Sequence, residues 1–466
     1  MQKPIKKLLI ANRGEIAVRI IRAARELDIR TVVVCSEADI DSQAVRLADE
    51  HALIGPAQAA KSYLDKDKVL AVAKEVGADA IHPGYGFLSE NASFAEACEQ
   101  SGIVFVGPSA SAIRTMGDKA AARTAAMAAG VPVVPGSDGE VGSLEGAIEA
   151  AGVIGYPVMI KAAAGGGGRG IRIAKDEAEL CQQYPIAVAE ATSAFGNGAV
   201  YLERFIASAR HIEVQVLGDG TSVIHLFERD CSIQRRRQKI FEEAGSPVLD
   251  EATRKALCAS AVKLAEAVAY RGAGTLEYLF DSESGEFFFI EMNTRIQVEH
   301  PITEMITGVD LLKAMLRIAA GESLPYSQQD ITRRGHAIEV RINAEDPEKQ
   351  FMPCPGLVGD IVWPQGPGVR IDSLLRAYYQ IPAYYDSLLA KLIVWDESRP
   401  AALARLKRSL GELSIAGVKT TQPLFLALLE TDAVKSGEYD TNWLERWMSG
   451  KREEQKPAES TAGSAI

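Results

Sequence analysis

Short apolar runs alternate with an amphipathic segment at the start of the chain. Lys7–Ala11 and Thr31–Cys35 are typical of buried strands, and Glu15–Leu27 between them has the 3.6-residue periodicity of a helix. Similar apolar runs recur at Ala78–Pro83 and Ile103–Gly107. Strands that alternate with helices predict an α/β fold with a parallel, Rossmann-like sheet. No Gly-x-Gly-x-x-Gly turn follows the first strand, which argues against dinucleotide binding.

Further along the chain the pattern changes. An alanine-rich helix is predicted over Asp118–Ala129 and a strand over Tyr156–Lys161, and beyond them strand patterns such as His211–Val216 and Gly274–Phe280 dominate. We therefore predict an α/β chain that is α+β in its later parts. The predicted division is an N-terminal domain at 1–115, further domains at 116–205, 206–330 and 331–447, and a disordered tail at 448–466.

The densest polar cluster is Phe289–Glu304, which contains carboxylates, an arginine, two amides and a histidine. It continues the aromatic run Glu286–Glu291, which predicts a strand. On an extended chain alternate residues share a face. That face would carry Glu291, Asn293, Arg295, Gln297 and Glu299. Burying such a face is costly without ions or ligands, so we predict a ligand site here; the alternative is a solvated edge strand.

A glycine run between two predicted strands indicates a phosphate-binding flap. Lys161–Gly170 reads Lys-Ala-Ala-Ala-Gly-Gly-Gly-Gly-Arg-Gly, and Ile171–Ala174 after it is strand-like, so neither a dinucleotide turn nor a Walker A loop fits. Backbone amides of such a loop can close over phosphate oxygens, and Lys161 can meet the same phosphates. A hairpin without function is the alternative reading.

Glu277 and Glu291 each lie on a predicted strand, and two carboxylates together with phosphate oxygens suit magnesium. The cationic run Arg235-Arg-Arg-Gln-Lys239 is interpreted as a wall that binds phosphate and another small anion. With a formal charge of −11 and no aromatic residues within this run, nucleic acid is not an expected partner.

Two features bear on location. The six cysteines lie far apart with no Cys-x-x-Cys pair, as in reduced proteins of the cytoplasm. No apolar run approaches the length that crosses a bilayer, and the first residues predict a strand, not a signal peptide. We predict a cytoplasmic protein without a membrane partner.

Taken in order, these clusters resemble the ATP-grasp superfamily, and within it biotin carboxylases. The resemblance covers roughly residues 5–447, and its full ordered set of motifs is specific. The motifs are Ala11-Asn-Arg-Gly-Glu-Ile-Ala, His82-Pro-Gly-Tyr-Gly-Phe-Leu-Ser-Glu-Asn91, Met116-Gly-Asp-Lys119, the glycine run, Glu228-Arg-Asp-Cys-Ser, Glu291-Met-Asn-Thr-Arg-Ile-Gln-Val-Glu-His-Pro301, Gly335–Asp346 and Tyr384-Tyr-Asp-Ser387.

The resemblance implies ATP-dependent carboxylation of carrier-bound biotin with bicarbonate, through carboxyphosphate. It implies an N-terminal biotin carboxylase domain, an ATP-grasp lid (116–205) and core (206–330), and a C-terminal biotin carboxylase domain. The implied phosphate-binding residues are Lys119, Lys161, Gly165, Gly166, Gly167, Gly168 and Gly170, and the adenine–ribose residues are Glu203, Arg204, Ile206, His211, Gln234 and Leu279. Arg237 would lie near the ribose and phosphates.

The remaining implied roles concern the metal and the chemistry. Mg²⁺ or Mn²⁺ would be bound by Glu277, Glu291 and Asn293, and bicarbonate by Lys239, Arg295, Gln297 and Val298. Glu299 would be the base and Arg341 the cation that steadies the biotin enolate. No biotinyl Ala-Met-Lys-Met motif occurs, so the expected partners are a separate biotin carboxyl carrier protein and a carboxyltransferase, with a homodimer as the assembly.

Two positions depart from the family pattern. Arg237 stands where the family commonly has histidine, which should alter nucleotide contacts more than bicarbonate chemistry. Ala244-Gly-Ser-Pro247 replaces the usual Ala-Pro-Ala-Pro, and the loss of a proline should loosen that segment. The resemblance implies the first half-reaction of an acetyl-CoA or other acyl-CoA carboxylase. The open alternatives are an acceptor other than acetyl-CoA (pyruvate, another acyl-CoA, urea), a carboxylate–amine ligase, and a regulatory subunit descended from the enzyme.

Overall fold

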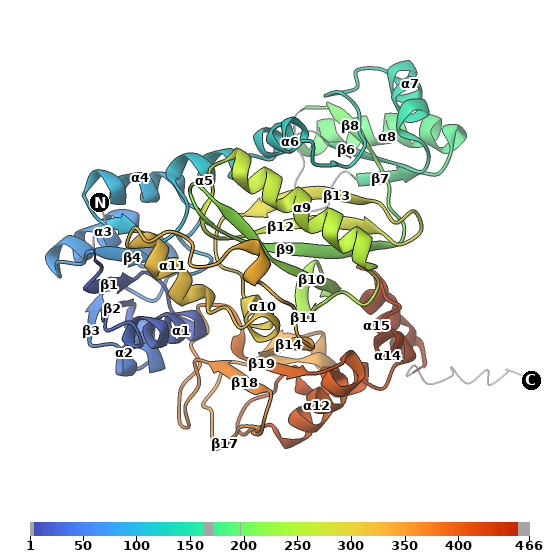
Figure 1. Cartoon of the computed structure of the whole chain (residues 1–466). Coiled ribbons are helices and arrows are strands. Elements are labelled where there is room, and N and C mark those ends of the chain that lie inside the picture. Colours follow the sequence, from blue (N-terminus) through green and yellow to red (C-terminus); the bar gives the residue numbers. More distant parts are fainter. Residues whose placement is uncertain (1–3, 163–170, 196, 455–466) are drawn as a thin grey trace, which may run out of the picture. The chain divides into compact units, whose positions relative to one another are not determined.

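The computed structural model describes residues 4–162, 171–195 and 197–454 (Figure 1). These residues form two compact units. The larger unit extends to Val131 and continues over Arg210–Tyr278 and from Glu291 onward. The smaller unit comprises Pro132–Ala209 and Leu279–Ile290.

The first sheet of the larger unit is parallel throughout, as the alternating pattern predicts. Its strand order is β3-β2-β1-β4-β5, so the first strand lies in the middle. The strands are β1 (Lys7–Ile10), β2 (Arg30–Cys35), β3 (Glu50–Leu53), β4 (Ala80–His82) and β5 (Val104–Phe105); the helices along this part are α1 (Gly14–Arg25), α2 (Gln43–Leu47), α3 (Lys66–Glu75), α4 (Ala92–Gln100), α5 (Ala110–Gly117) and α6 (Lys119–Ala128).

An eight-stranded sheet carries most of the polar clusters. Its order is β13-β12-β9-β10-β11-β14-β19-β18. The strands are β9 (Ala209–Asp219), β10 (Val223–Arg235), β11 (Gln238–Ala244), β12 (Arg271–Asp281), β13 (Phe287–Asn293), β14 (His336–Asn343), β18 (Val369–Ser373) and β19 (Leu388–Asp396). Two small ribbons pair β15 (Glu345–Asp346) with β16 (Met352–Pro353) and β17 (Ile361–Val362) with β20 (Ser414–Ile415).

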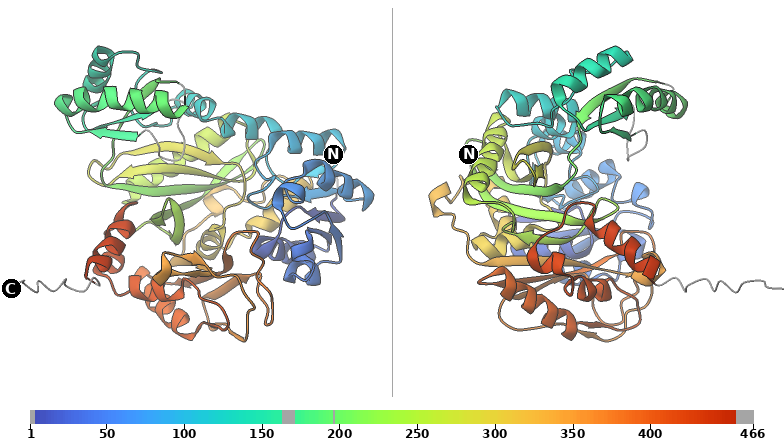
Figure 2. Two further views of the ribbon diagram at one scale, coloured as in Figure 1. Left: turned by 180° about the vertical axis from the view of Figure 1, so that it is seen from behind. Right: turned by 90° about the vertical axis from the view of Figure 1, so that its right-hand side faces the viewer.

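Helices cover both faces of this sheet. α9 (Glu251–Ala267) packs along β10, as Figures 1 and 2 show from three sides. The other helices of this part are α10 (His300–Thr307), α11 (Leu311–Ala319), α12 (Arg399–Glu412), α13 (Gln422–Leu428), α14 (Asp432–Ser436) and α15 (Trp443–Glu454). Leu406 of α12 lies in one apolar cluster with Ile338, Val340 and Ile342 of β14, whereas Ala337 packs with Ile302 of α10. The odd-numbered face of β14 is therefore the face that α10 covers.

The smaller unit is built on a three-stranded sheet in the order β7-β6-β8. Its strands are β6 (Val158–Ala162), β7 (Ile171–Ala174) and β8 (Val200–Arg204), with helices α7 (Leu144–Ile154) and α8 (Glu177–Phe195). Val158, Ile160 and Leu202 form its core with alanines of the two helices. The predicted glycine flap at Gly165, Gly166, Gly167, Gly168 and Gly170 lies outside the described residues.

The expectation of one extended strand from Glu291 to Glu299 is wrong. β13 ends at Asn293, and Glu299 is the N-cap residue of α10. Pro301 in the first turn and Gly308 at the left-handed C-cap (φ 75°) are the signals that define this helix. Among the described residues, the helices lack the combination of length and apolar composition that crossing a membrane requires, and all six cysteines are free.

Candidate active site

A single lysine joins three strands and a helix terminus at the centre of the site. Lys239 of β11 is within ion-pair distance of Glu213 on β9; its Nζ lies 2.8 Å from Oε1 of Glu277 on β12 and 2.9 Å from Oε1 of Glu299. Glu213 and Glu299 are fully buried. Carboxylates from three elements can gather here only because a buried cation offsets their repulsion.

Glu299 also binds an arginine. Its Oε2 accepts a hydrogen bond from Nη2 of Arg341 on β14 at 3.0 Å, and Arg341 Nε donates to Glu242 Oε1 at 2.7 Å. The Arg341 side chain stays 18% exposed, so part of the guanidinium is accessible. A buried carboxylate held by two cations, beside a partly open arginine, is an arrangement suited to accepting a proton near a developing negative charge.

The charges of this cluster set the protonation of its members. Burial alone would raise the pKa of Glu299, but Lys239 and Arg341 outweigh it and hold that pKa well below its ordinary value. Burial alone would lower the pKa of Lys239, but its three carboxylates raise it well above the usual range. Both groups are therefore ionised at neutral pH: Glu299 carries no proton, and Lys239 keeps its positive charge.

The predicted metal ligands gather on neighbouring strands. Glu277 lies on β12 and Glu291 on β13, which are adjacent in the sheet. Burial raises the pKa of Glu291, and the charge of Glu277 raises it further. Two carboxylates in mutual repulsion on adjacent strands fit a divalent cation. The third predicted ligand, Asn293, donates to Glu277 Oε1 at 2.9 Å.

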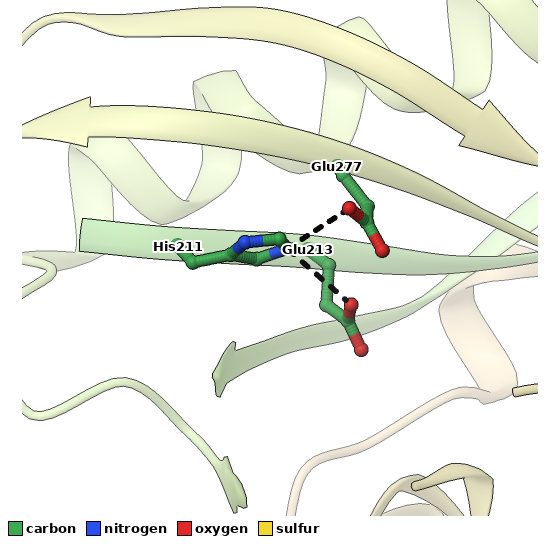
Figure 3. Close-up of side chains that lie close together, drawn as sticks. All are labelled: His211, Glu213 and Glu277. Carbon is green, nitrogen blue, oxygen red and sulfur yellow. Dashed lines mark ion pairs between the residues drawn. The ribbon is translucent and has the colours of Figure 1, made fainter. Parts of the chain in front are cut away.

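A second group of potential metal ligands consists of His211 and Glu213 of β9 together with Glu277 (Figure 3). His211 Nε2 lies 3.1 Å from Glu277 Oε2 and 3.9 Å from Glu213 Oε2. On its other side, His211 Nδ1 is 3.1 Å from the amide nitrogen of Gln234. The structure thus brings His211 and Gln234, both predicted at the nucleotide, to the edge of the carboxylate cluster.

The loop after β13 is held by Glu90, a residue of the His82–Asn91 motif to which the sequence analysis assigns no role. Its Oε2 pairs with Arg295 Nε at 2.8 Å, and its Oε1 accepts from the Thr294 backbone at 3.0 Å. Arg295 Nη1 donates to Gln297 Oε1 at 3.0 Å, and Nη2 donates to Asn293 Oδ1 at 2.8 Å. Arg295 and Gln297 therefore lie together, as predicted, but on a folded loop. Val298 follows them, and its carbonyl accepts from Lys391 at 2.8 Å.

The other predicted nucleotide residues lie on separate elements. Lys119 begins α6 in the larger unit. In the smaller unit, Lys161 of β6 pairs with Glu203 of β8, and Arg204 Nη1 lies 3.1 Å from Glu286. Ile206 and Leu279 pack together beside Phe288.

The cationic run does not form one wall. Lys239 alone of these cations joins the carboxylate cluster. Arg235 lies over the ring of Phe351, 3.7 Å from its centroid. Arg236 and Arg237 are exposed at the turn between β10 and β11, with φ of 49° and 65°. The physical reason is strand alternation followed by a tight turn, which sends neighbouring side chains in different directions.

Comparisons with known proteins identify the family. Family models described as "Biotin carboxylase, N-terminal domain", "Carbamoyl-phosphate synthase L chain, ATP binding domain" and "Biotin carboxylase C-terminal domain" match residues 4–113, 118–327 and 339–446. Biotin carboxylase 1 of Bacillus subtilis is 54% identical, over 95% of this chain and 99% of that protein. The chain belongs to the biotin carboxylase family. A pyruvate carboxylase component of Methanothermobacter thermautotrophicus is 50% identical, over 95% of this chain and 90% of that protein.

Solved structures of biotin carboxylases have the same fold. The biotin carboxylase domain of a thermophilic 2-oxoglutarate carboxylase bound to bicarbonate has a TM-score of 0.91 at 48% identity, covering 95% of this chain and 98% of that one. The dimer of that domain from Hydrogenobacter thermophilus, in complex with MgADP, ADP and bicarbonate, has a TM-score of 0.85 at 50% identity, with the same coverage. The predicted family and the α/β fold are confirmed.

Hydrogen bonds hold the segment Ala244–Pro247, where the departure from the family pattern is expected to loosen the chain. Ser246 donates from Oγ to Asp230 Oδ2 at 2.9 Å and from its backbone nitrogen to Glu228 Oε1 at 3.0 Å. Gly245 has a φ of 90° and donates to the Glu228 carbonyl at 3.3 Å. Glycine permits a backbone conformation that proline cannot adopt, and serine adds the bonds that fix it.

Gly245→Pro should therefore destabilise the protein by more than about 1 kcal/mol, because proline fixes φ near −65° and removes the N–H donor. Urea unfolding would measure the loss. Ser246→Ala is the matched control: it keeps the backbone and removes one side-chain hydrogen bond, so its effect should be smaller. A Gly245→Pro protein as stable as the original chain would contradict this account of the segment.

Sequence reasoning missed three buried partners in this biotin carboxylase fold, Glu213, Arg229 and Glu242. Arg229 Nε donates to Glu213 Oε1 at 2.6 Å, so Glu213 bridges Arg229 and Lys239. The strand pattern over His211–Val216 held a usable signal, since Glu213 shares a face with His211. Glu242 had no such signal, because its contact with Arg341 depends on which strands are neighbours.

Proposed function

We propose that the chain is an ATP-dependent biotin carboxylase, which transfers a carboxyl group from bicarbonate to biotin held on a carrier protein. Family membership supports the activity, and the single structural observation that carries it is Glu299. Glu299 is fully buried yet ionised, between Lys239 and Arg341. Bicarbonate is a weak nucleophile until it loses its proton, and a desolvated carboxylate of this kind can accept that proton.

In the first step of the proposed reaction, Glu299 takes the proton of bicarbonate, and a bicarbonate oxygen attacks the γ-phosphorus of ATP. The bond to the β-phosphate oxygen breaks, which releases ADP and leaves carboxyphosphate. Carboxyphosphate then separates into carbon dioxide and phosphate, and the phosphate takes the ureido proton of biotin. The biotin nitrogen attacks carbon dioxide. Arg341 stabilises the enolate oxygen that forms, since a guanidinium remains charged while protons move around it.

The remaining residues have binding roles in the proposal. Lys239, Arg295, Gln297 and Val298 bind bicarbonate. Lys119, Lys161, the glycine run at 165–170 and Arg237 bind the phosphates and ribose, and Glu203, Arg204, Ile206, His211, Gln234 and Leu279 bind the adenosine. Glu277, Glu291 and Asn293 would hold Mg²⁺ or Mn²⁺, which when bound neutralises charge on the phosphates.

The domain division and partners belong to the same proposal. The division at 1–115, 116–205, 206–330 and 331–447 assigns the glycine run to a lid that excludes water. A carrier protein and a carboxyltransferase are proposed as partners, and a homodimer is proposed from the dimeric relative of Hydrogenobacter thermophilus. The free cysteines support a cytoplasmic location.

The final acceptor is a property of the partner, because this half-reaction touches only ATP, bicarbonate and biotin. Relatives include components of pyruvate and 2-oxoglutarate carboxylases as well as proteins named simply biotin carboxylase. Acetyl-CoA or another acyl-CoA is the proposed acceptor. Capture of the carrier with its carboxyltransferase, followed by assay of the captured complex with each candidate acceptor, decides among them.

The test of the function is ADP formation with and without bicarbonate and free biotin. The proposal expects ATP turnover that requires bicarbonate and rises with biotin. Stimulation by an amine acceptor in place of biotin would favour a carboxylate–amine ligase. ATP binding without turnover under any of these conditions would favour a regulatory subunit.

A further inference from the structure

Two buried carboxyl groups lie directly opposite each other behind Arg341. Glu242 of β11 and Glu339 of β14 are register partners in an antiparallel pair, and both are fully buried. Register partners project to the same face, with Cβ atoms about 4.5–5.5 Å apart. Arg341, two residues beyond Glu339, projects to that face as well.

The hydrogen bonding of this pair is incomplete without a proton. Glu242 Oε1 accepts from Arg341 Nε. Within the described part of the chain, the other oxygen of Glu242 and both oxygens of Glu339 have no hydrogen-bond partner. Buried polar atoms are nearly always paired, and two facing carboxylates cannot pair while both are ionised. One proton between them supplies a hydrogen bond that pairs two of these three oxygens.

The surroundings of the pair favour the protonated form. The charged groups that face it are Arg341 from β14, Lys239 from β11, Glu299 at the N-cap of α10 and Lys391 from β19. Otherwise this face packs against α10 through apolar contacts such as Ile302 with Ile393. Burial raises the pKa of Glu242 to about 7 and raises the pKa of Glu339 well above its ordinary value.

We propose that Glu242 and Glu339 share one proton and act as a single negative charge that orients Arg341. Both are positioning residues, since they reach the substrate only through the arginine. This inference rests on the proposed function, which assigns Arg341 to the biotin enolate. The bond from Arg341 Nε to Glu242 fixes the plane of the guanidinium, and the exposed part of the side chain remains available to biotin.

The pair loses its single charge at either end of a pH range. When it takes up a second proton, as the pH falls through about 7, Glu242 no longer holds Arg341 by a charge-assisted bond. When it loses the shared proton at high pH, two ionised carboxylates face each other in a buried site. The working state lies between these limits.

Unfolding measurements test the shared proton without any assay of activity. The folded protein keeps a proton that the unfolded chain releases above its ordinary carboxyl pKa, so this pair destabilises the fold as the pH rises. Glu339→Gln replaces the acid by an amide, whose N–H group can donate to Glu242 at any pH. We expect the apparent unfolding temperature of the variant to exceed that of the original chain by an amount that grows from pH 5.5 to pH 8.5 and reaches about 4 °C or more at pH 8.5.

The matched control is Glu243→Gln, one residue along β11. Glu243 accepts from Arg399 and His336, and these partners lower its pKa although burial alone would raise it. Glu243→Gln should therefore be less stable than the original chain at both pH values. A Glu339→Gln variant with the same pattern would overturn the proposal, because Glu339 would then be an ordinary ionised partner.

A spectroscopic measurement on the unmodified chain covers the case in which Glu339→Gln does not fold. The infrared spectrum at pH 8 should contain the carbonyl band of a buried protonated carboxyl, which the Glu242→Gln variant alters. Absence of any such band at pH 8 would overturn the shared proton.

Kinetics test the positioning role. Glu242→Gln should lower kcat with biotin by about tenfold or more, the worth of a hydrogen bond to a charged group, and leave KM for ATP within about twofold. In the pH–rate profile, biotin-dependent turnover of the original chain should fall as the pH falls through about 7, and the profile of the variant should not show this fall. The same fall in the profile of Glu242→Gln would refute the role of Glu242. If the original chain shows no biotin-dependent turnover, the proposed function fails, while the unfolding and infrared results still decide the shared proton.

Discussion

Glu299→Gln should lower biotin-dependent ATP turnover by about 10²–10⁴-fold, the usual worth of a positioned general base. Glutamine has nearly the same shape as glutamate but cannot take the proton of bicarbonate. The cluster around it should persist, since Lys239 keeps Glu213 and Glu277 as partners. We expect a large decrease in kcat, measured from initial rates of ADP formation. The affinity for ATP, measured by calorimetric titration with nucleotide, should change little.

The matched control is Glu412→Gln, which removes a carboxylate 44% exposed in a surface pair with Arg408. It should leave both rate and affinity unchanged. Turnover of Glu299→Gln close to that of the original chain would reject Glu299 as the base. Loss of nucleotide binding in the same variant would instead indicate that the substitution disturbs the metal and phosphate residues around Glu277.

The local elements of the fold were predictable because each depends on residues close in sequence. The apolar runs at Lys7–Ala11 and Thr31–Cys35 contain β1 and most of β2, and the amphipathic stretch between them contains most of α1. The strand over Glu286–Glu291 was also correct, but its extension to Glu299 was not. Pro301 and Gly308 mark the ends of α10, and the helix places Glu299 at its start, clear of the strand.

The partners inside the site were less predictable, because they depend on the order of strands in the sheet. Lys239 of β11 contacts Glu277 of β12 although β9 and β10 lie between these strands in the sheet, an order that a single sequence does not set. Glu242 and Glu339 face each other through a register that the hydrophobic pattern alone does not set, since both are polar positions in buried strands. Recognition of the family motifs found Glu299 and Arg341, whereas the roles of Glu242 and Glu339 behind Arg341 came only from the structure.

Lys239→Met should destabilise the protein by about 3–5 kcal/mol at neutral pH, the usual cost of removing one partner from a buried ionic cluster. Methionine fills a similar volume but leaves the charges of three buried carboxylates without their common cation. Each retains at least one other partner, among them Arg229 for Glu213, His211 for Glu277 and Arg341 for Glu299. The variant should therefore fold, with a lower midpoint in urea unfolding. Lys407→Met, at a surface pair with Glu430, is the control and should leave the midpoint unchanged.

The pH dependence separates this electrostatic cause from a loss of packing. The lysine lowers the folded-state pKa values of Glu277 and Glu299, so its stabilisation is present above the ordinary carboxyl pKa and is lost as the pH falls through the folded-state values. Without Lys239 those pKa values rise, and protonation relieves the repulsion at mildly acidic pH. The difference in unfolding midpoint between Lys239→Met and the original chain should shrink from pH 7 to pH 5. A difference that stays constant over this range would show that Lys239 stabilises the site by filling space, and Glu299 would then need another source for its low pKa.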